Sequence, residues 1–204
     1  MNLPIIKPTT GMLIGAGGAA LVVGILYTWE KVLTQKWVNA CQEVYGPLGH
    51  AEQRTIRLIV QFFDLFGDGD SRKLAYIFAT VDAECSFISK KEHPSSYNVR
   101  QEYWQTNYMG RGLVQITGKR NYQKVSDLLG VDFVTYPEKA LELAYAVRIL
   151  VEGMMTGLFS RRKLGDYIND QQTDFYRARQ VVNGLDKAAI IAGNAAEILA
   201  YYQS

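Results

Sequence analysis

Two glutamates eight positions apart, Glu84 and Glu92, offer the clearest acid–base chemistry in this chain. Glu84 lies near the end of a stretch in which Leu74, Ile77 and Val81 recur at helical spacing. A carboxyl group at the edge of an apolar helix has its charged form disfavoured, which suits a general acid. Glu92 follows two lysines in a predicted loop, where an ionised carboxylate suits a base that acts on water. Two carboxyl groups in contrasting environments are what cleavage of a glycosidic bond requires.

Downstream of the two glutamates, polar residues and glycines could contact a substrate. Gln115, Thr117 and Asn121 lie in a glycine-punctuated segment, and glycine lets a backbone approach a ligand closely. We predict that residues 93–108 form an irregular lobe or short hairpin beside a cleft. Aromatic rings there could stack on sugar faces, or could serve only packing: Tyr97, Tyr103, Trp104 and Tyr108.

Helices are predicted to position these residues. A helix over 50–66 should bury one face, made of Ile56, Ile59, Phe63 and Phe66, and stop at Gly67. Asp70 or Ser71 should cap the next helix. The later helices are predicted over 122–129 with a stop at Gly130, over 137–155 with Ala140, Leu141, Ala144, Val147 and Leu150 largely buried, over about 173–182, and over 187–202.

The N-terminal region contains an uncharged apolar run, residues 11–29, which is about long enough to cross a bilayer as a helix. Tyr27 and Trp29 stand where an aromatic interface belt would. Lys7 precedes the run, so the positive-inside rule places the N-terminus in the cytoplasm and the rest of the chain outside. A cleaved signal peptide and a buried core helix are the alternatives.

Five glycines and three alanines make this run only weakly hydrophobic. It resembles the signal-anchor-release segments of phage endolysins, which first tether and then free the enzyme. An ordinary anchor is the alternative, with its small residues packed against a partner helix, a second copy or a virion protein. The predicted organisation is an N-terminal tail (1–10), a transmembrane helix (11–29), a connector (30–49) and a catalytic domain (50–204).

Ordered motifs extend through most of that domain. The stretch ATVDAE-x-x-F-x-x-x-x-E begins at Ala79, and Y-x-GRG-x-VQ-x-T-x-x-x-NY begins at Tyr108. Further stretches are YPEKAL from Tyr136, KLGDY from Lys163 and RARQVVNG from Arg177. Together they resemble the family 19 glycoside hydrolases, the chitinases and related endolysins of the lysozyme-like superfamily. The resemblance implies a mainly α, lysozyme-like fold without a cofactor.

The resemblance also implies roles for individual residues. Glu84 matches the general acid and Glu92 the glutamate that activates water, while Thr117 matches a residue that helps to hold this water. The expected substrate-binding residues are Gln115, Asn121, Tyr108, Arg179 and Asn183. Arg179 also matches an arginine near the acid, where it could lower the cost of charge on Glu84; a purely structural ion pair is the alternative. The family commonly has His where this chain has Ala83, and an aromatic-proline stretch where this chain has residues 87–91. Because of the second difference, Glu102 is an alternative base.

Composition excludes several other classes. A net charge of +2 is too small to indicate nucleic-acid binding. Residues 64–70 lack the ligand pattern of a calcium loop, and His50 and His93 are isolated, so no metal site is predicted. Cys41 and Cys85 could pair if the domain lies outside the cytoplasm; two unpaired thiols, with Cys85 buried, are the favoured alternative.

We therefore expect a membrane-anchored peptidoglycan hydrolase that faces the periplasm or cell wall and cleaves β-1,4 bonds with inversion. It would serve phage lysis or wall penetration. Chitin is the alternative substrate. The alternative function is a non-catalytic virion or wall-binding protein on the same fold.

Overall fold

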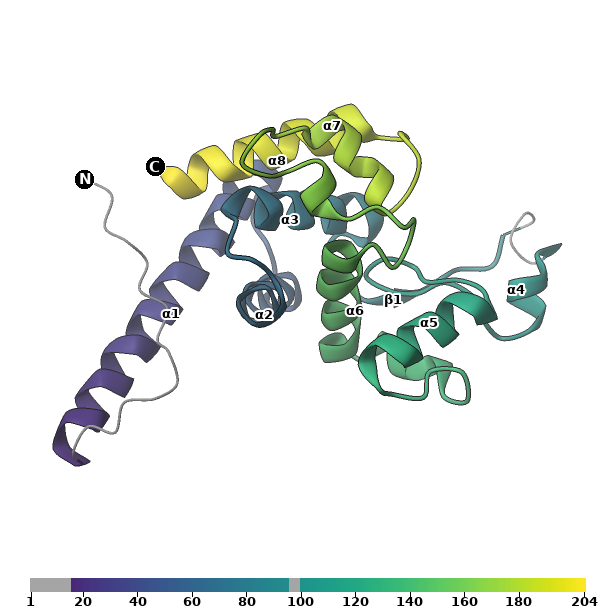
Figure 1. Ribbon diagram of the computed structural model, residues 1–204, viewed down its shortest axis with the longest axis horizontal. Helices are drawn as coiled ribbons and strands as arrows, with labels where there is room; N and C mark the ends of the chain where they lie inside the picture. Colours follow the sequence, from purple (N-terminus) through teal and green to yellow (C-terminus); the bar gives the residue numbers. More distant parts are fainter. Residues whose placement is uncertain (1–15, 96–99) are drawn as a thin grey trace.

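The computed structural model describes residues 16–95 and 100–204, and its fold is mainly helical (Figure 1). The helices are α1 (Ala16–Tyr45), α2 (His50–Phe66), α3 (Ser71–Cys85), α4 (Glu102–Gln105), α5 (Lys119–Leu129), α6 (Leu143–Thr156), α7 (Phe175–Ala178) and α8 (Ala188–Gln203). Short 3₁₀ helices cover Pro137–Leu141, Leu164–Asp166 and Arg179–Val181. Strands β1 (Lys90–Lys91) and β2 (Arg111–Gly112) form an antiparallel pair, with Lys90 opposite Gly112.

Helix α1 is continuous where a transmembrane helix and a separate connector were predicted. No glycine or proline occurs between Gly24 and Gly46, so nothing in this stretch interrupts the helix. It ends before Gly46, whose φ of 80° is left-handed. The second half of α1 is part of the core: Val38 and Cys41 are buried, and Trp37 stacks on Tyr202 of α8 at 3.6 Å between ring centroids.

The predicted membrane span starts outside the described residues, since 11–15 are not among them. Among residues 16–95 and 100–204, no helix combines the length and the apolar character needed to cross a membrane.

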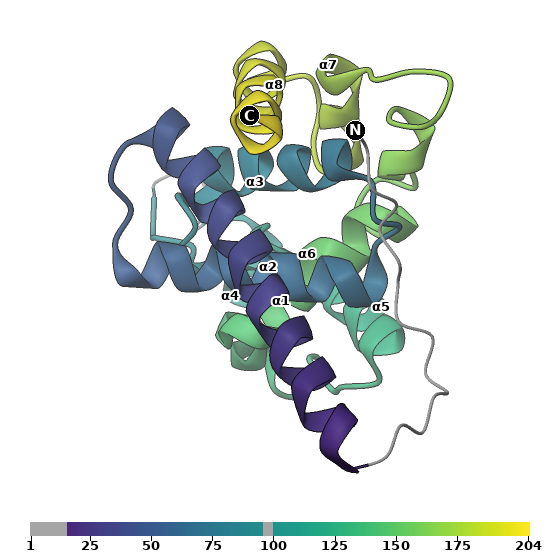
Figure 2. The ribbon, with the colours of Figure 1, turned by 90° about the vertical axis from the view of Figure 1, so that its left-hand side faces the viewer.

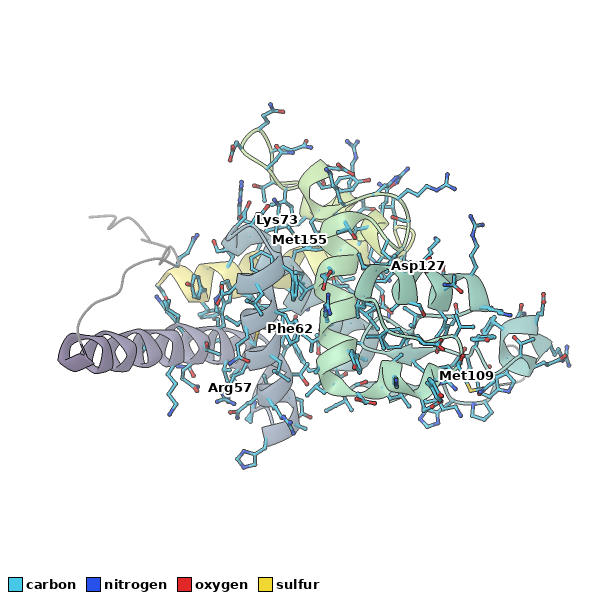
Figure 3. The ribbon with its side chains drawn as sticks, turned by 60° about the horizontal axis from the view of Figure 1, so that its bottom comes forward. Arg57, Phe62, Lys73, Met109, Asp127 and Met155 are labelled. Atoms are coloured by element: carbon cyan, nitrogen blue, oxygen red, sulfur yellow. The ribbon has the colours of Figure 1, made fainter. Side chains whose placement is uncertain are left out.

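Helix α3 lies at the centre of the helical body, with α8 packed along it (Figures 1 and 2). Every residue from Lys73 to Val81 is buried, so α3 is enclosed on all sides rather than on the single face that the sequence indicated. Arg57 and Phe62 of α2 lie on one side of α6 (Figure 3). Met109, which precedes β2, and Asp127 of α5 lie on the other side. The molecule thus has a helical body and a smaller lobe that carries β1, β2, α4 and α5.

Several predicted helix boundaries are confirmed. Helix α2 spans the predicted residues and ends at Gly67. Asp70 caps α3, because its carboxylate accepts a hydrogen bond from the Arg72 amide at 3.0 Å. Gly130 ends α5 in a left-handed conformation, although α5 starts at Lys119, three residues earlier than predicted.

Other expectations were wrong. Phe66 is 38 % exposed, because it lies in the last turn of α2, at the edge of the core. The helix predicted over 137–155 is broken at Glu142, whose extended backbone (ψ 124°) separates a 3₁₀ turn from α6. This break changes the helix register, so Ala144 is exposed and Leu141 is only half-buried. The helix predicted over 173–182 is instead α7 followed by a 3₁₀ turn.

Candidate active site

Glu84 lies in the last turn of α3 and forms an ion pair with Arg179, which begins the 3₁₀ turn after α7. The Glu84 Oε1 to Arg179 Nη1 distance is 2.6 Å, and the two side chains are 19 % and 2 % exposed. The two atoms lack the alignment of a hydrogen bond, and neither has another partner among the described residues. A charge contact alone therefore compensates the burial of these atoms.

Backbone contacts tie this ion pair to the start of α8. Arg179 Nε donates to the carbonyl of Asp186 at 2.9 Å, and Lys187 Nζ donates to the carbonyl of Ala83 at 3.3 Å. Tyr76 lies two turns before Glu84 on α3. Its burial raises the pKa of its hydroxyl, an effect that the nearby Arg179 charge only partly opposes. The turn before α8 thus fixes the guanidinium against the end of α3.

Glu92 directly follows β1 and is half-buried. Its amide donates to the Gly110 carbonyl at 2.7 Å, and its Oε2 accepts from the Gly110 amide at 2.9 Å. Its Oε1 accepts from the Tyr103 hydroxyl at 3.1 Å. Both carboxylate oxygens therefore have hydrogen-bond donors, which suits an ionised group.

A hollow of about 140 Å³ lies between the start of α5 and the segments around residues 158–159 and 182. Its polar lining comes from Gln115, Thr117 and Asn121, the residues predicted from the motif; its apolar lining is Val114, Ile116, Val125, Leu158, Phe159 and Val182. Neither Glu84 nor Glu92 lines this hollow.

Local bonds shape the polar side of the hollow. Gln115 has a left-handed φ of 51°, and its side-chain amide donates to the carbonyls of Lys90 and Gly112 at 2.8 and 2.9 Å. Asn121 donates to the Thr117 carbonyl at 2.8 Å. Gln115 therefore connects the hollow to both strands of the β1–β2 pair, and Glu92 directly follows β1.

The structure gives other predicted site residues a structural environment. The Tyr108 hydroxyl donates to the Val134 carbonyl at 3.2 Å, and its ring contacts Tyr122 at 5.3 Å between centroids. Asn183 is exposed just after the Arg179 turn, and its Oδ1 accepts from the Gly184 amide. Glu102, the alternative base, is exposed on α4. Tyr97 lies outside the described residues.

No role was predicted for Arg111, which organises the lobe. Arg111 is 3 % exposed, and its guanidinium donates to the Asn107 and Met109 carbonyls and to the Tyr122 hydroxyl. An arginine between two glycines in an otherwise apolar segment was the available signal. Tyr103 was expected either to stack on sugar or to serve packing, yet its hydroxyl donates to Glu92.

Both cysteines are unpaired and buried, which confirms the favoured alternative. Burial raises the pKa of the Cys41 thiol and raises that of Cys85 to about 12. In the ranges 16–95 and 100–204, no group of His, Cys, Asp or Glu side chains is arranged to hold a metal ion.

The chain matches no protein-family profile and no curated protein at a significant level.

Proposed function

We propose that this protein is a glycoside hydrolase that cleaves β-1,4 bonds of peptidoglycan with inversion. One observation carries the proposal: the motif residues Gln115, Thr117 and Asn121, which run from the turn after β2 to the first turn of α5, line a single hollow. The Glu84–Arg179 ion pair supports it, because the buried guanidinium can stabilise the carboxylate that a general acid becomes once it has given up its proton.

In the proposed mechanism, Glu84, which is paired with Arg179 as a carboxylate in the free protein, binds a proton before catalysis and gives it to the oxygen of the leaving sugar. The negative charge that Glu84 then regains is stabilised by the Arg179 guanidinium. Glu92 accepts a proton from a water molecule that Thr117 helps to hold, and this water attacks the opposite face of the sugar ring. Because Glu92 already accepts two hydrogen bonds, its orientation is set before the substrate binds.

The composition of the hollow favours an N-acetylated sugar. Its amide and hydroxyl groups can bond to an acetamido group, and its apolar side, which includes Leu158 and Phe159, suits a methyl group. Such sugars occur in both peptidoglycan and chitin. We favour peptidoglycan because the uncharged run 11–29 is proposed to anchor the domain outside the bacterial inner membrane, where the wall is the first polymer it meets.

The direct test uses the full-length chain in mild detergent, as wild type, Glu84→Gln and Glu92→Gln, incubated with purified peptidoglycan or with chitin. Released fragments are reduced and identified by mass spectrometry. We expect intact reducing-end sugars from peptidoglycan with the wild type and a loss of at least about 10²-fold with either variant. Equal release by wild type and Glu84→Gln would refute the mechanism.

A non-catalytic wall-binding protein is the second candidate. Two departures from the family that the chain resembles favour it: Ala83 stands where the family commonly has His, and residues 87–91 replace its aromatic-proline stretch. In that case, the wild type would sediment with peptidoglycan without releasing any fragment.

Membrane attachment is tested separately. Carbonate extraction of membranes from expressing cells retains a spanning segment and removes a peripheral protein. A time course of transfer to the soluble periplasm then distinguishes a releasing anchor from a permanent one.

A further inference from the structure

We infer that Tyr103 is a positioning residue that holds the proposed base Glu92 in its reactive orientation. The inference rests on the proposed function, in which Glu92 activates water. Tyr103 is not part of the sequence motif. It lies on α4, in the smaller lobe, between β1 and β2 in the chain.

The two oxygens of Glu92 are held by donors from different segments. Tyr103, on α4, donates its hydroxyl to Oε1 at 3.1 Å, and Gly110, next to β2, donates its amide to Oε2 at 2.9 Å. A carboxylate with one donor can still rotate about that contact, whereas two donors on two oxygens fix its plane. Removal of the phenol oxygen should therefore loosen the hold on Oε1 without removing the carboxylate.

Gly110 lies close against Glu92, beside Cβ and Oε2. A Cβ atom on Gly110 would lie 3.2 Å from both Cβ and Oε2 of Glu92, and 2.8 Å from Gln115 Oε1. Glycine alone permits this close contact. The backbone of Glu92 is fixed as well, because its amide donates to the Gly110 carbonyl at 2.7 Å. The Tyr103 hydroxyl is thus a contact to Glu92 that a substitution can remove without changing the backbone.

Tyr103 is itself connected to the body of the protein. Its carbonyl accepts from the Tyr108 amide at 2.9 Å. The Tyr108 carbonyl accepts from the Gly118 amide at 2.8 Å, and the Tyr108 hydroxyl donates to the Val134 carbonyl at 3.2 Å. These hydrogen bonds fix Tyr103, whose hydroxyl bonds to Glu92, relative to the chain around α5. They also explain why Tyr108, expected to bind sugar, is directed into the protein.

The test compares Tyr103→Phe, which removes one oxygen atom, with a matched control, Tyr201→Phe, an exposed tyrosine near the end of α8. The first readout is the hydrogen exchange of the Gly110 amide, followed by NMR in the full-length protein. Glu92→Ala removes the acceptor and sets the fast limit. We expect exchange in Tyr103→Phe to be several-fold faster than in the wild type, and unchanged in Tyr201→Phe. An unchanged rate in Tyr103→Phe would overturn the inference, whatever the activity.

The second readout is steady-state kinetics on peptidoglycan. We expect kcat of Tyr103→Phe to fall about tenfold, since a hydrogen bond to a charged group is lost, with KM nearly unchanged. A wild-type kcat in Tyr103→Phe alongside an inactive Glu92→Gln would overturn the positioning role and leave the proposed function intact. A fully active Glu92→Gln would instead overturn the assignment of Glu92 as the base, and with it this inference.

Discussion

Removal of either member of the Glu84–Arg179 pair should destabilise the protein, and the two losses should not add. At 2.6 Å and an effective dielectric constant of about 20, the Coulomb attraction is about 6 kcal/mol, a gross value that desolvation largely offsets. Deletion of one partner leaves the other charge buried, which costs about 3 kcal/mol. We therefore expect Glu84→Gln to lose about 3 kcal/mol.

Arg179→Met should lose about 4 kcal/mol, because it also removes the hydrogen bond to the Asp186 carbonyl. The double variant should lose only about 1 kcal/mol, because no charge is then left unpaired and only the hydrogen bond to the Asp186 carbonyl is missing. The expected coupling energy is thus about 6 kcal/mol. Total stabilities of about 5–15 kcal/mol would keep all three variants folded.

The assay is urea unfolding of the four proteins, followed by tryptophan fluorescence. Arg177→Met is the matched control: its side chain is 71 % exposed and lies 3.8 Å from Asp174, so its stability should stay within about 0.5 kcal/mol of the wild type. Single-variant losses that add to within about 0.5 kcal/mol would show that Glu84 and Arg179 do not interact, and would refute the reasoning.

Two further variants test packing and charge. Gly153→Ala should lower stability by about 1–3 kcal/mol, because its Cβ would lie 2.3 Å from the Phe159 ring. Gly193→Ala, with no atom within 4 Å of its Cβ, should raise stability by about 0.5–1 kcal/mol. Equal shifts of the two melting temperatures would contradict this. Burial of Asp70 would raise its pKa, but the hydrogen bonds and charge of Arg72 lower it. The resulting stabilisation is present above the unfolded-state pKa of about 3.9 and is lost as the pH falls through the folded-state pKa. Asp70→Asn should therefore be less stable than the wild type at pH 7 and equal to it near pH 2, and a gap that persists in acid would exclude this cause.

The sequence predicted those parts of the fold that depend on local signals. The stop at Gly67, the cap at Asp70 and the left-handed end at Gly130 each follow from the chemistry of one residue. It failed at Glu142, where no glycine or proline marks the break and the surrounding core decides the backbone. The second half of α1 was predicted to be a connector, whereas it belongs to the core. The stacking of Trp37 on Tyr202 joins two distant parts of the chain, and such a contact leaves no local signal in the sequence.

The site was predictable only to the level of its residue types. A motif indicated Gln115, Thr117 and Asn121, and all three line one hollow. The position of Arg179 beside Glu84 was predicted. The bond from Tyr103 to Glu92 was not, since it depends on geometry that no spacing encodes. Whether Glu84 and Glu92 carry out catalysis stays a prediction.

The unbroken course of α1 makes it a lever. Thirty residues of α-helix rise about 45 Å, and the second half is fixed in the core, so the first half transmits any force directly to the elements beside α3. A flexible linker would let the domain move in all directions around its point of attachment. A rigid helix instead holds the domain at one distance from that point and allows it to rotate only about the helix axis. If residues 11–29 lie in a bilayer as proposed, the enzyme would cut within a thin layer of the wall, and its reach could be lengthened by inserting helical turns near residue 30.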